Sequence, residues 1–331
     1  MDIFRGSWST FSDLRDSAVT VGSFDGVHVG HRDVIARLVK TAQEHNLRSV
    51  VITFETHPRD VMDSVDYPVP LLTTTEEKLE LLAETGVDLT MVLQFDHSLG
   101  ELSPRDFVQV VLCGRIGMKR IVVGFNHAFG KGRQGDRESL IALSREIGFH
   151  VEVENPTRID DVIISSTKIR KMVAEGDMVF ASKGLSRHYT LSGTVIHGFG
   201  RGKRLGYPTA NLGLIQSNKL PPKDGIYAGF GLLENGEVYP AAISIGFNPT
   251  FGEGKHSLEA HLIGFDGDIY DQKLRLNFIE RIRGEEKYHD ESELIQAIRR
   301  DIGTISTLLK TRHHSFPDSA AEVCSSQTKQ E

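Results

Sequence analysis

The chain has 331 residues, of which 39% are hydrophobic and 25% are charged, and its formal net charge is -7. This length predicts two domains, and the negative charge gives no basic surface for nucleic acid, which we do not expect as a partner. Its two cysteines, Cys113 and Cys324, and the lack of a long apolar run exclude a disulfide framework and a membrane span and favour a cytoplasmic protein.

Short β-branched segments alternate with amphipathic segments through the first half of the chain. The predicted strands are residues 17–21, 50–54, 89–93, 120–124 and 150–153, and the predicted helices are residues 75–84, 104–116, 137–147 and 166–174, with one more after residue 31. This alternation predicts an α/β fold with a parallel sheet. Ligands bind beyond the carboxyl ends of the strands in such sheets.

Short strands separated by glycine-rich turns dominate the second half. We predict strands at residues 189–196, 227–233, 240–245, 258–263 and 274–278, which indicate an antiparallel barrel or sandwich. One amphipathic helix closes this region, with a buried face of Leu294, Ile295, Ile298, Ile302, Ile305, Leu308 and Leu309. The predicted domains are residues 1–186 and 187–311, followed by a polar, disordered tail at 312–331.

A glycine-rich turn at residues 22–31, with the sequence GSFDGVHVGH, connects the first predicted strand to a helix. Unpaired N–H groups and the helix dipole favour phosphate oxygens at such a junction. Glycines at 22, 26 and 30 allow the backbone to approach a ligand closely. His28 and His31 are three residues apart and can therefore face one phosphate chain together. A surface turn that merely caps the helix is the alternative.

A second anion site is predicted where the helix of residues 166–174 begins. Hydroxyl and backbone groups of Ser165, Ser166 and Thr167 can hold phosphate oxygens. Arg170, one turn later, can neutralise charge on a departing pyrophosphate. Ordinary helix capping by the serines, with Arg170 in solvent, is the simpler alternative.

The segment 198–211, GFGRGKRLGYPTAN, joins a basic glycine-rich loop to a Pro-Thr-Ala-Asn sequence. Its spacing is not that of a P-loop, because no serine or threonine follows Gly202-Lys203, and no helix follows as a Rossmann motif requires. A polar turn between strands is the alternative to a phosphate site.

These motifs, in this order, resemble those of bacterial bifunctional riboflavin kinase/FMN adenylyltransferases, often called FAD synthetases, over roughly residues 17–310. The turn at 22–31 resembles the His-x-Gly-His motif of nucleotidyltransferases, and residues 206–211 resemble the riboflavin kinase motif. The resemblance implies a Rossmann-like nucleotidyltransferase sheet followed by an antiparallel β-barrel closed by a helix. It also implies two reactions with ATP: riboflavin is phosphorylated to FMN, and FMN is adenylylated to FAD with release of pyrophosphate.

For the first half, the resemblance implies that His28, His31 and Arg170 act on the triphosphate. ATP or its phosphates would also contact Gly22, Phe24, Gly30, Ser165, Ser166 and Thr167. The loop after residue 124 resembles the flavin loop of the family, with Asn126 and Phe129 as flavin-binding candidates. Many relatives have an acidic-aromatic pair where this chain has Asn126-His127.

For the second half, the resemblance implies that Thr209 and Asn211 bind Mg²⁺, consistent with the preference of this cation for oxygen ligands. Glu259 is the expected base, because the ribityl hydroxyl needs help to lose its proton. Further phosphate contacts are expected from Gly198, Gly200, Lys203 and Gly206. On an alternating strand, Glu259 could instead simply face solvent.

The sequence leaves two other functions open: a riboflavin kinase whose adenylyltransferase half is impaired, and a flavin-binding regulator without turnover. The second is disfavoured because Glu259, Thr209, His28 and His31 are all present. A zinc site at the two histidines is also disfavoured, because no further ligand cluster lies nearby in the sequence. The expected partners are riboflavin, FMN and ATP, and a homo-oligomer is left open.

Overall fold

The computed structural model describes residues 1–56, 58–62, 68–125, 127–198, 200–214, 218–247 and 256–312. The candidate Asn126 and the tail from residue 313 lie outside the described residues. Two compact units divide the chain between Lys168 and Ile169, whereas composition places the boundary near residue 186. Across the described residues, no helix is both long and apolar enough to span a bilayer.

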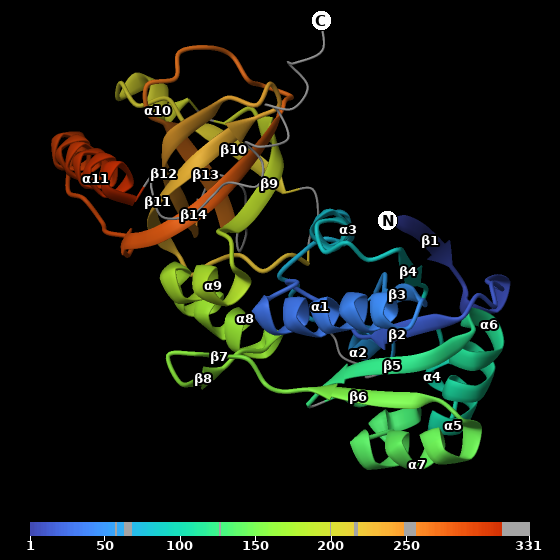
Figure 1. The fold of residues 1–331 in the computed structure, drawn as a ribbon. Helices are drawn as coiled ribbons and strands as arrows, with labels where there is room; N and C mark the ends of the chain where they lie inside the picture. Colours follow the sequence, from blue (N-terminus) through green and yellow to red (C-terminus); the bar gives the residue numbers. More distant parts are fainter. Residues whose placement is uncertain are drawn as a thin grey trace, which may run out of the picture. The chain divides into compact units, whose positions relative to one another are not determined.

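The first unit contains a six-stranded parallel sheet (Figure 1). Its strands are β1 (Asp2–Gly6), β2 (Ser17–Val21), β3 (Arg48–Phe54), β4 (Leu89–Leu93), β5 (Met118–Gly124) and β6 (His150–Glu154). The spatial order is β1-β4-β3-β2-β5-β6, so β2 lies in the middle and is buried along its whole length. The predicted parallel α/β sheet is confirmed, and β1 adds an edge strand that the sequence pattern did not indicate.

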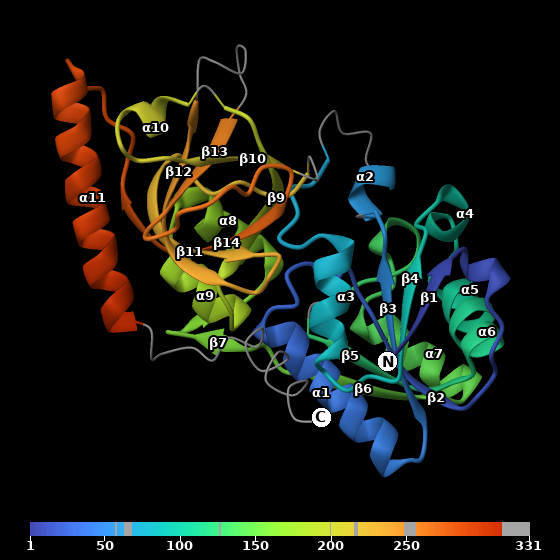
Figure 2. The same cartoon turned by 90° about the horizontal axis from the view of Figure 1, so that it is seen from above.

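Helices cover both faces of this sheet (Figure 2). They are α1 (Val29–Glu44), α2 (Pro58–Met62), α3 (Thr75–Ala83), α4 (His97–Gly100), α5 (Pro104–Asp106), α6 (Gly114–Ile116) and α7 (Arg137–Ile147). The predicted helix at 104–116 contains a π-helical stretch, Phe107–Cys113, between α5 and α6. One apolar layer joins α1 and α3 to the sheet, and a second joins the π-helical stretch and α7 to its other face.

A short hairpin and two helices follow the sheet in the chain. These are β7 (Arg158–Ile159), β8 (Val162–Ile163), α8 (Ser166–Glu175) and α9 (Met178–Leu185). The division between the two units falls inside α8. The helix predicted at 166–174 is therefore confirmed. Helix α9 lies between it and residue 187, after which the sequence pattern changes from alternating strands and helices to strands separated by glycine-rich turns.

The second unit is a closed six-stranded antiparallel barrel in the order β10-β13-β12-β11-β14-β9. Its elements are β9 (Tyr189–Ile196), α10 (Arg201–Arg204), β10 (Ala210–Leu214), β11 (Gly225–Leu233), β12 (Val238–Phe247), β13 (His256–Leu262), β14 (Lys273–Arg283) and α11 (Glu291–Arg312). This confirms the barrel implied by the resemblance. The closing strand β10 was not predicted, because its Asn-Leu-Gly-Leu sequence carries little β propensity.

Helix α11 packs on the outside of the barrel, against β11 and β12. Its most deeply buried residues are Ala297, Asp301, Ile305 and Leu309, at four-residue spacing. The predicted buried face was therefore partly wrong: Leu294, Ile295, Ile298, Ile302 and Leu308 are only half-buried. A single helix against a convex surface buries a narrow stripe. The charge of Asp301 within that stripe is balanced by Arg283, whose Nη2 lies 2.7 Å from Oδ2.

Candidate active site

The turn between β2 and α1 lies at the carboxyl edge of the parallel sheet. Gly22 continues the ladder by donating its N–H to the Ile52 carbonyl at 3.0 Å. Beyond it, Phe24 and Val27 adopt positive φ angles of 47° and 37° although neither is glycine. Both side chains are almost completely buried. Such conformations cost free energy and persist only where the surrounding structure holds them, so the turn is fixed from outside.

His28 caps α1 and stacks on His31. Its Nδ1 accepts the His31 N–H at 3.3 Å, and the centroids of the two imidazoles are 3.6 Å apart with nearly parallel planes. Because Nδ1 is an acceptor here, a neutral His28 carries its proton on Nε2 and can donate from that edge of the ring. The Phe24 ring meets His31 edge-on at 5.1 Å. The structure thus brings Phe24, His28 and His31 together.

Gly30 lets this cluster pack closely. A Cβ atom at this position would lie 3.3–3.4 Å from the His28 ring and 3.4 Å from the Thr157 hydroxyl. A side chain at this position would be in tight contact with the capping imidazole, which would have to shift by a few tenths of an ångström. Close packing on the histidine therefore favours glycine here.

Asp25, a residue of the turn itself, holds the turn in place by hydrogen bonds. Its buried carboxylate accepts the N–H groups of Leu72 and Thr73 at 2.9 and 3.1 Å. The Thr73 hydroxyl in turn accepts the Gly26 N–H at 3.0 Å. On the other side, the Ser166 hydroxyl donates to the Asp25 carbonyl at 2.9 Å. Asp25 thereby ties the turn both to the chain before α3 and to the start of α8.

The beginning of α8 combines capping and exposed hydroxyls. Ser165 Oγ accepts the Lys168 N–H at 3.2 Å, so part of the capping interpretation applies. Thr167 is exposed, and Ser166 is joined to the turn as described above. Arg170 is half-buried one turn further on, in the part of α8 that belongs to the second unit. Its action on the triphosphate remains a prediction.

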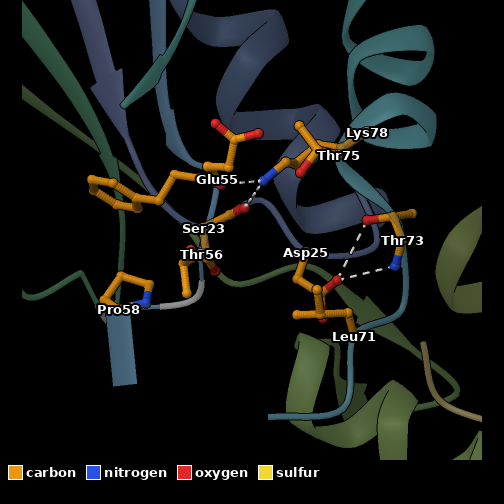
Figure 3. Close-up of a pocket in the computed structure, with 10 residues that line it drawn as sticks. Ser23, Asp25, Glu55, Thr56, Pro58, Leu71, Thr73, Thr75 and Lys78 are labelled. Atoms are coloured by element: carbon orange, nitrogen blue, oxygen red, sulfur yellow. Dashed lines mark hydrogen bonds between the residues drawn. The ribbon is translucent and has the colours of Figure 1, made fainter. Parts of the chain in front are cut away.

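A small pocket lies beside the turn, between the ends of β2 and β3 and the start of α3 (Figure 3). It leaves about 20 Å³ for the centres of water-sized spheres, which is room for about one water molecule. The ammonium of Lys78 enters it from α3. This Nζ donates to the Ser23 carbonyl, the Thr53 hydroxyl and the Phe54 carbonyl at 3.2, 3.0 and 2.9 Å. Burial lowers the pKa of Lys78 from 10.5 to about 8.

The predicted flavin loop is described only in part, since Asn126 lies outside the described residues. Phe129 is 7% exposed and belongs to the apolar layer beneath the sheet. Its ring lies 6.0 Å from Phe107 and stacks with His127 at 5.6 Å. Protein contacts thus cover most of this ring, and a flavin contact by Phe129 remains a prediction.

In the barrel, the Thr209 hydroxyl donates to Glu259 Oε2 at 3.0 Å. Asn211 on β10 pairs in register with Glu259 on β13, so both side chains start from the same face of the sheet. Leu258 and Ala260 point into the barrel core, which places Glu259 on the outside. The structure therefore groups Thr209, Asn211 and Glu259 on one patch of the outer surface.

The glycine-rich loop approaches this patch closely. A Cβ at Gly198 would lie 2.4 Å from Asn211 Nδ2, and one at Gly202 would lie 2.3 Å from the Tyr207 carbonyl. Gly200 and Gly206 have φ angles of 65° and 83° and open space around them. Lys203 is exposed on α10. In this loop Gly198 packs against Asn211, whereas Gly200 and Gly206 adopt left-handed backbone conformations.

The sequence analysis gave no role to Asp25, Thr73 or Lys78. The signal for Lys78 was its position: it lies four residues before Leu82, on the buried face of α3, where a lysine is rarely found. Asp25 was quoted only as part of the turn. Its partners Leu72 and Thr73 are almost fifty residues away in the chain, and no local pattern connects them.

A parallel-sheet unit with a glycine-rich, histidine-bearing turn and a closed-barrel unit with a hydroxyl–carboxylate patch are typical of a two-part nucleotide-handling enzyme. A family model described as FAD synthetase matches residues 10–168, and one described as riboflavin kinase matches residues 185–309. The chain belongs to the family of bifunctional riboflavin kinases/FMN adenylyltransferases.

Relatives of that name are similar over nearly the whole chain. The Haemophilus influenzae protein is 34% identical over 92% of this chain and 98% of its own, and the Bacillus subtilis protein is 35% identical over 86% and 90%. A crystal structure described as a macrolide-efflux protein from Streptococcus pneumoniae superposes with a TM-score of 0.84. It is 27% identical and covers 92% of this chain and 99% of that one.

Proposed function

We propose that the chain catalyses both reactions of its family, and that each unit carries one of them. The barrel transfers the γ-phosphoryl group of ATP to riboflavin, giving FMN and ADP. The parallel-sheet unit transfers the adenylyl group of a second ATP to FMN, giving FAD and pyrophosphate. The observation that carries this assignment is that each family model covers a different fold, and each fold gathers its own set of candidate residues.

In the barrel, we assign Glu259 as the general base. A carboxylate within hydrogen-bonding reach accepts the proton of the ribityl 5′-hydroxyl as its oxygen attacks the γ-phosphorus. The hydrogen bond from Thr209 holds the Glu259 carboxylate in one orientation. The contact between Gly198 and the Asn211 amide suits a loop that folds over the phosphates.

Thr209, Asn211 and Glu259 supply only oxygen and amide donors, a set that suits Mg²⁺ and not a soft metal. We propose that Thr209 and Asn211 hold this cation, which would offset phosphate charge when bound. The residues around it keep separate tasks: Glu259 accepts the proton, and Gly200, Lys203 and Gly206 shape the phosphate loop.

In the parallel-sheet unit, we assign phosphate binding to the turn and the two helix starts that meet it. Phosphate oxygens of ATP accept hydrogen bonds from His28, His31 and the backbone N–H groups of Phe24 and Gly30, while Gly22, whose N–H donates to Ile52, lets the nucleotide approach the backbone closely. Ser165, Ser166 and Thr167 at the start of α8 hold the departing pyrophosphate, and we assign the neutralisation of its charge to Arg170, which follows one turn later on the same helix beyond the division between the two units. The FMN phosphate attacks the α-phosphorus directly, so catalysis depends on positioning and charge stabilisation and needs no covalent enzyme intermediate. Asn126 and Phe129 remain the proposed flavin contacts.

The test is a product assay on the full chain. Riboflavin, ATP and MgCl₂ are supplied in one reaction and FMN, ATP and MgCl₂ in another, and FMN, FAD, ADP and pyrophosphate are separated by chromatography. Both FMN and FAD are expected in the first reaction. FMN alone would indicate a single-activity kinase, and neither product would indicate a flavin-binding regulator. The cytoplasmic location and the homo-oligomer stay predictions.

A further inference from the structure

Lys78 is a buried cation beside the strained turn, and the proposed mechanism gives it no task. It lies on α3 and is 7% exposed, and its ammonium reaches three oxygen atoms at the carboxyl ends of two strands. A charge buried so completely is unfavourable unless it is well paired. An apolar residue at this helix position would fold without that cost, so the lysine calls for a functional explanation.

The three acceptors link β3 to the turn that follows β2. Thr53 and Phe54 end β3, while Ser23 is the residue immediately before Phe24. The Thr53 hydroxyl also donates to the Ser23 carbonyl, at 3.0 Å. The Ser23 carbonyl thus receives two hydrogen bonds, of which Figure 3 shows the one from Lys78, and the peptide that leads into Phe24 is held in one orientation.

Phe24 transmits this constraint to the histidines. The peptide that Lys78 and Thr53 hold is bonded directly to Phe24, whose φ is 47° and whose ring centroid lies 5.1 Å from that of His31. His31 in turn stacks on His28. Contacts therefore connect the Lys78 ammonium through Ser23 and Phe24 to the two imidazoles.

We propose that Lys78 is a positioning residue for adenylyl transfer: its ammonium fixes the Ser23 peptide and thereby the placement of Phe24, His31 and His28 on the nucleotide. This inference rests on the proposed function of the first unit. The negative charges of Asp25, Glu55 and Glu76 favour the charged form of the ammonium, while burial opposes it. Lys78 touches neither substrate, and the cation acts through the backbone.

The test compares Lys78→Met with the wild type. Methionine has similar length but neither the charge nor the donors. We expect kcat for FAD formation from FMN to fall roughly 10- to 100-fold, because misplacement by about 1 Å costs up to about 10²-fold. KM values for FMN and ATP should change less than kcat. FMN formation from riboflavin in the same preparation serves as an internal control and should be unchanged.

Two further variants keep the proposal open to refutation. Thr53→Val keeps the lysine but removes one acceptor and the second bond to Ser23, and should lower the same kcat by a smaller factor. Lys40→Met on α1 removes an exposed lysine and should leave kcat for FAD formation unchanged. In the Lys78→Met/Thr53→Val double variant the losses should not multiply, because both act on one peptide.

The outcomes separate the two claims. If the wild type forms no FAD, the proposed function of the first unit fails. If the wild type forms FAD and a folded Lys78→Met protein matches it in kcat, the positioning role is wrong. Should Lys78→Met not fold, as judged by its circular dichroism melt, Thr53→Val decides, and wild-type kcat in that variant would overturn the proposal.

Discussion

The two units hold their candidate residues in different ways. In the parallel-sheet unit, the histidines sit on an irregular turn whose residues Phe24 and Val27 are at positive φ, and buried polar groups beneath the turn keep it in place. In the barrel, Asn211 and Glu259 sit on regular strands, and ladder register alone places them side by side.

This difference predicts where each unit is vulnerable. A strained turn depends on side chains far away in sequence, such as Thr73 and Lys78, so substitutions outside the motif should affect adenylyl transfer. A strand pair needs no such support, because its hydrogen-bond ladder is formed by the backbone. Kinase activity should therefore depend mainly on the residues of the motif itself.

The largest effect should come from Glu259→Gln, which keeps the shape but removes the base. We expect FMN formation to fall by roughly 10²- to 10⁴-fold, the usual contribution of general base catalysis. FAD formation from supplied FMN should stay at the wild-type rate. The exposed Glu237→Gln, in the turn before β12, is the matched control. Loss of both products in a folded Glu259→Gln protein would refute the division of labour.

His28→Ala should have the next largest effect. Losing a donor to the phosphate chain should lower kcat for FAD formation by roughly 10²- to 10³-fold. The helix cap is lost as well, which should cost about 1 kcal/mol of stability. FMN formation should be spared. His45→Ala, at the other end of α1, should alter neither product, and equal effects of the two alanine variants would argue against a role for His28.

The buried charge of Lys78 should appear in the pH dependence of stability. Its pKa is about 8 in the folded chain against 10.5 for the unfolded reference. Below pH 8 both states hold the proton and the full cost of burial is present. Between pH 8 and 10.5 the lysine is protonated mainly in the unfolded state. The unfolding free energy of the wild type should therefore rise with pH relative to that of Lys78→Met, by at most about 1.4 kcal/mol per pH unit.

Urea titrations of wild type and Lys78→Met at pH 7, 8, 9 and 10 measure this difference in unfolding free energy. The other titrating groups are the same in both proteins, so their contributions largely cancel in the difference. Above pH 10.5 the difference should level off. A difference that is flat from pH 7 to 10 would show that the lysine is not buried as a cation beside the turn.

The smallest effect should come from Gly303→Ala on α11. A Cβ there would meet no atom within 4 Å, and the position is exposed within a helix. Alanine should stabilise the barrel by about 0.5–1 kcal/mol, because glycine loses more backbone entropy on folding. The midpoint of thermal unfolding of the barrel should rise with both activities unchanged. A lower midpoint would mean that α11 is not a regular helix at this point.

Local sequence patterns located most of the fold. The predicted strands 17–21 and 89–93 and the helix 137–147 have the boundaries found in the structure, because hydrophobic periodicity and capping residues are local signals. Strand β10 escaped prediction, since its Pro-Thr-Ala-Asn-Leu-Gly-Leu context has turn-forming residues and only its barrel neighbours make it a strand.

The sequence by itself therefore determined the two fold classes, the turn with its two histidines, and Thr209, Asn211 and Glu259 as candidates, because each lies in a short motif. Only the tertiary structure decided three contacts: Thr209 donates to Glu259, Asp25 accepts from Leu72 before α3, and Lys78 donates to Ser23 in the turn. Each of these contacts joins residues far apart in the chain. Their pairing depends on strand order and helix packing, which no local pattern encodes.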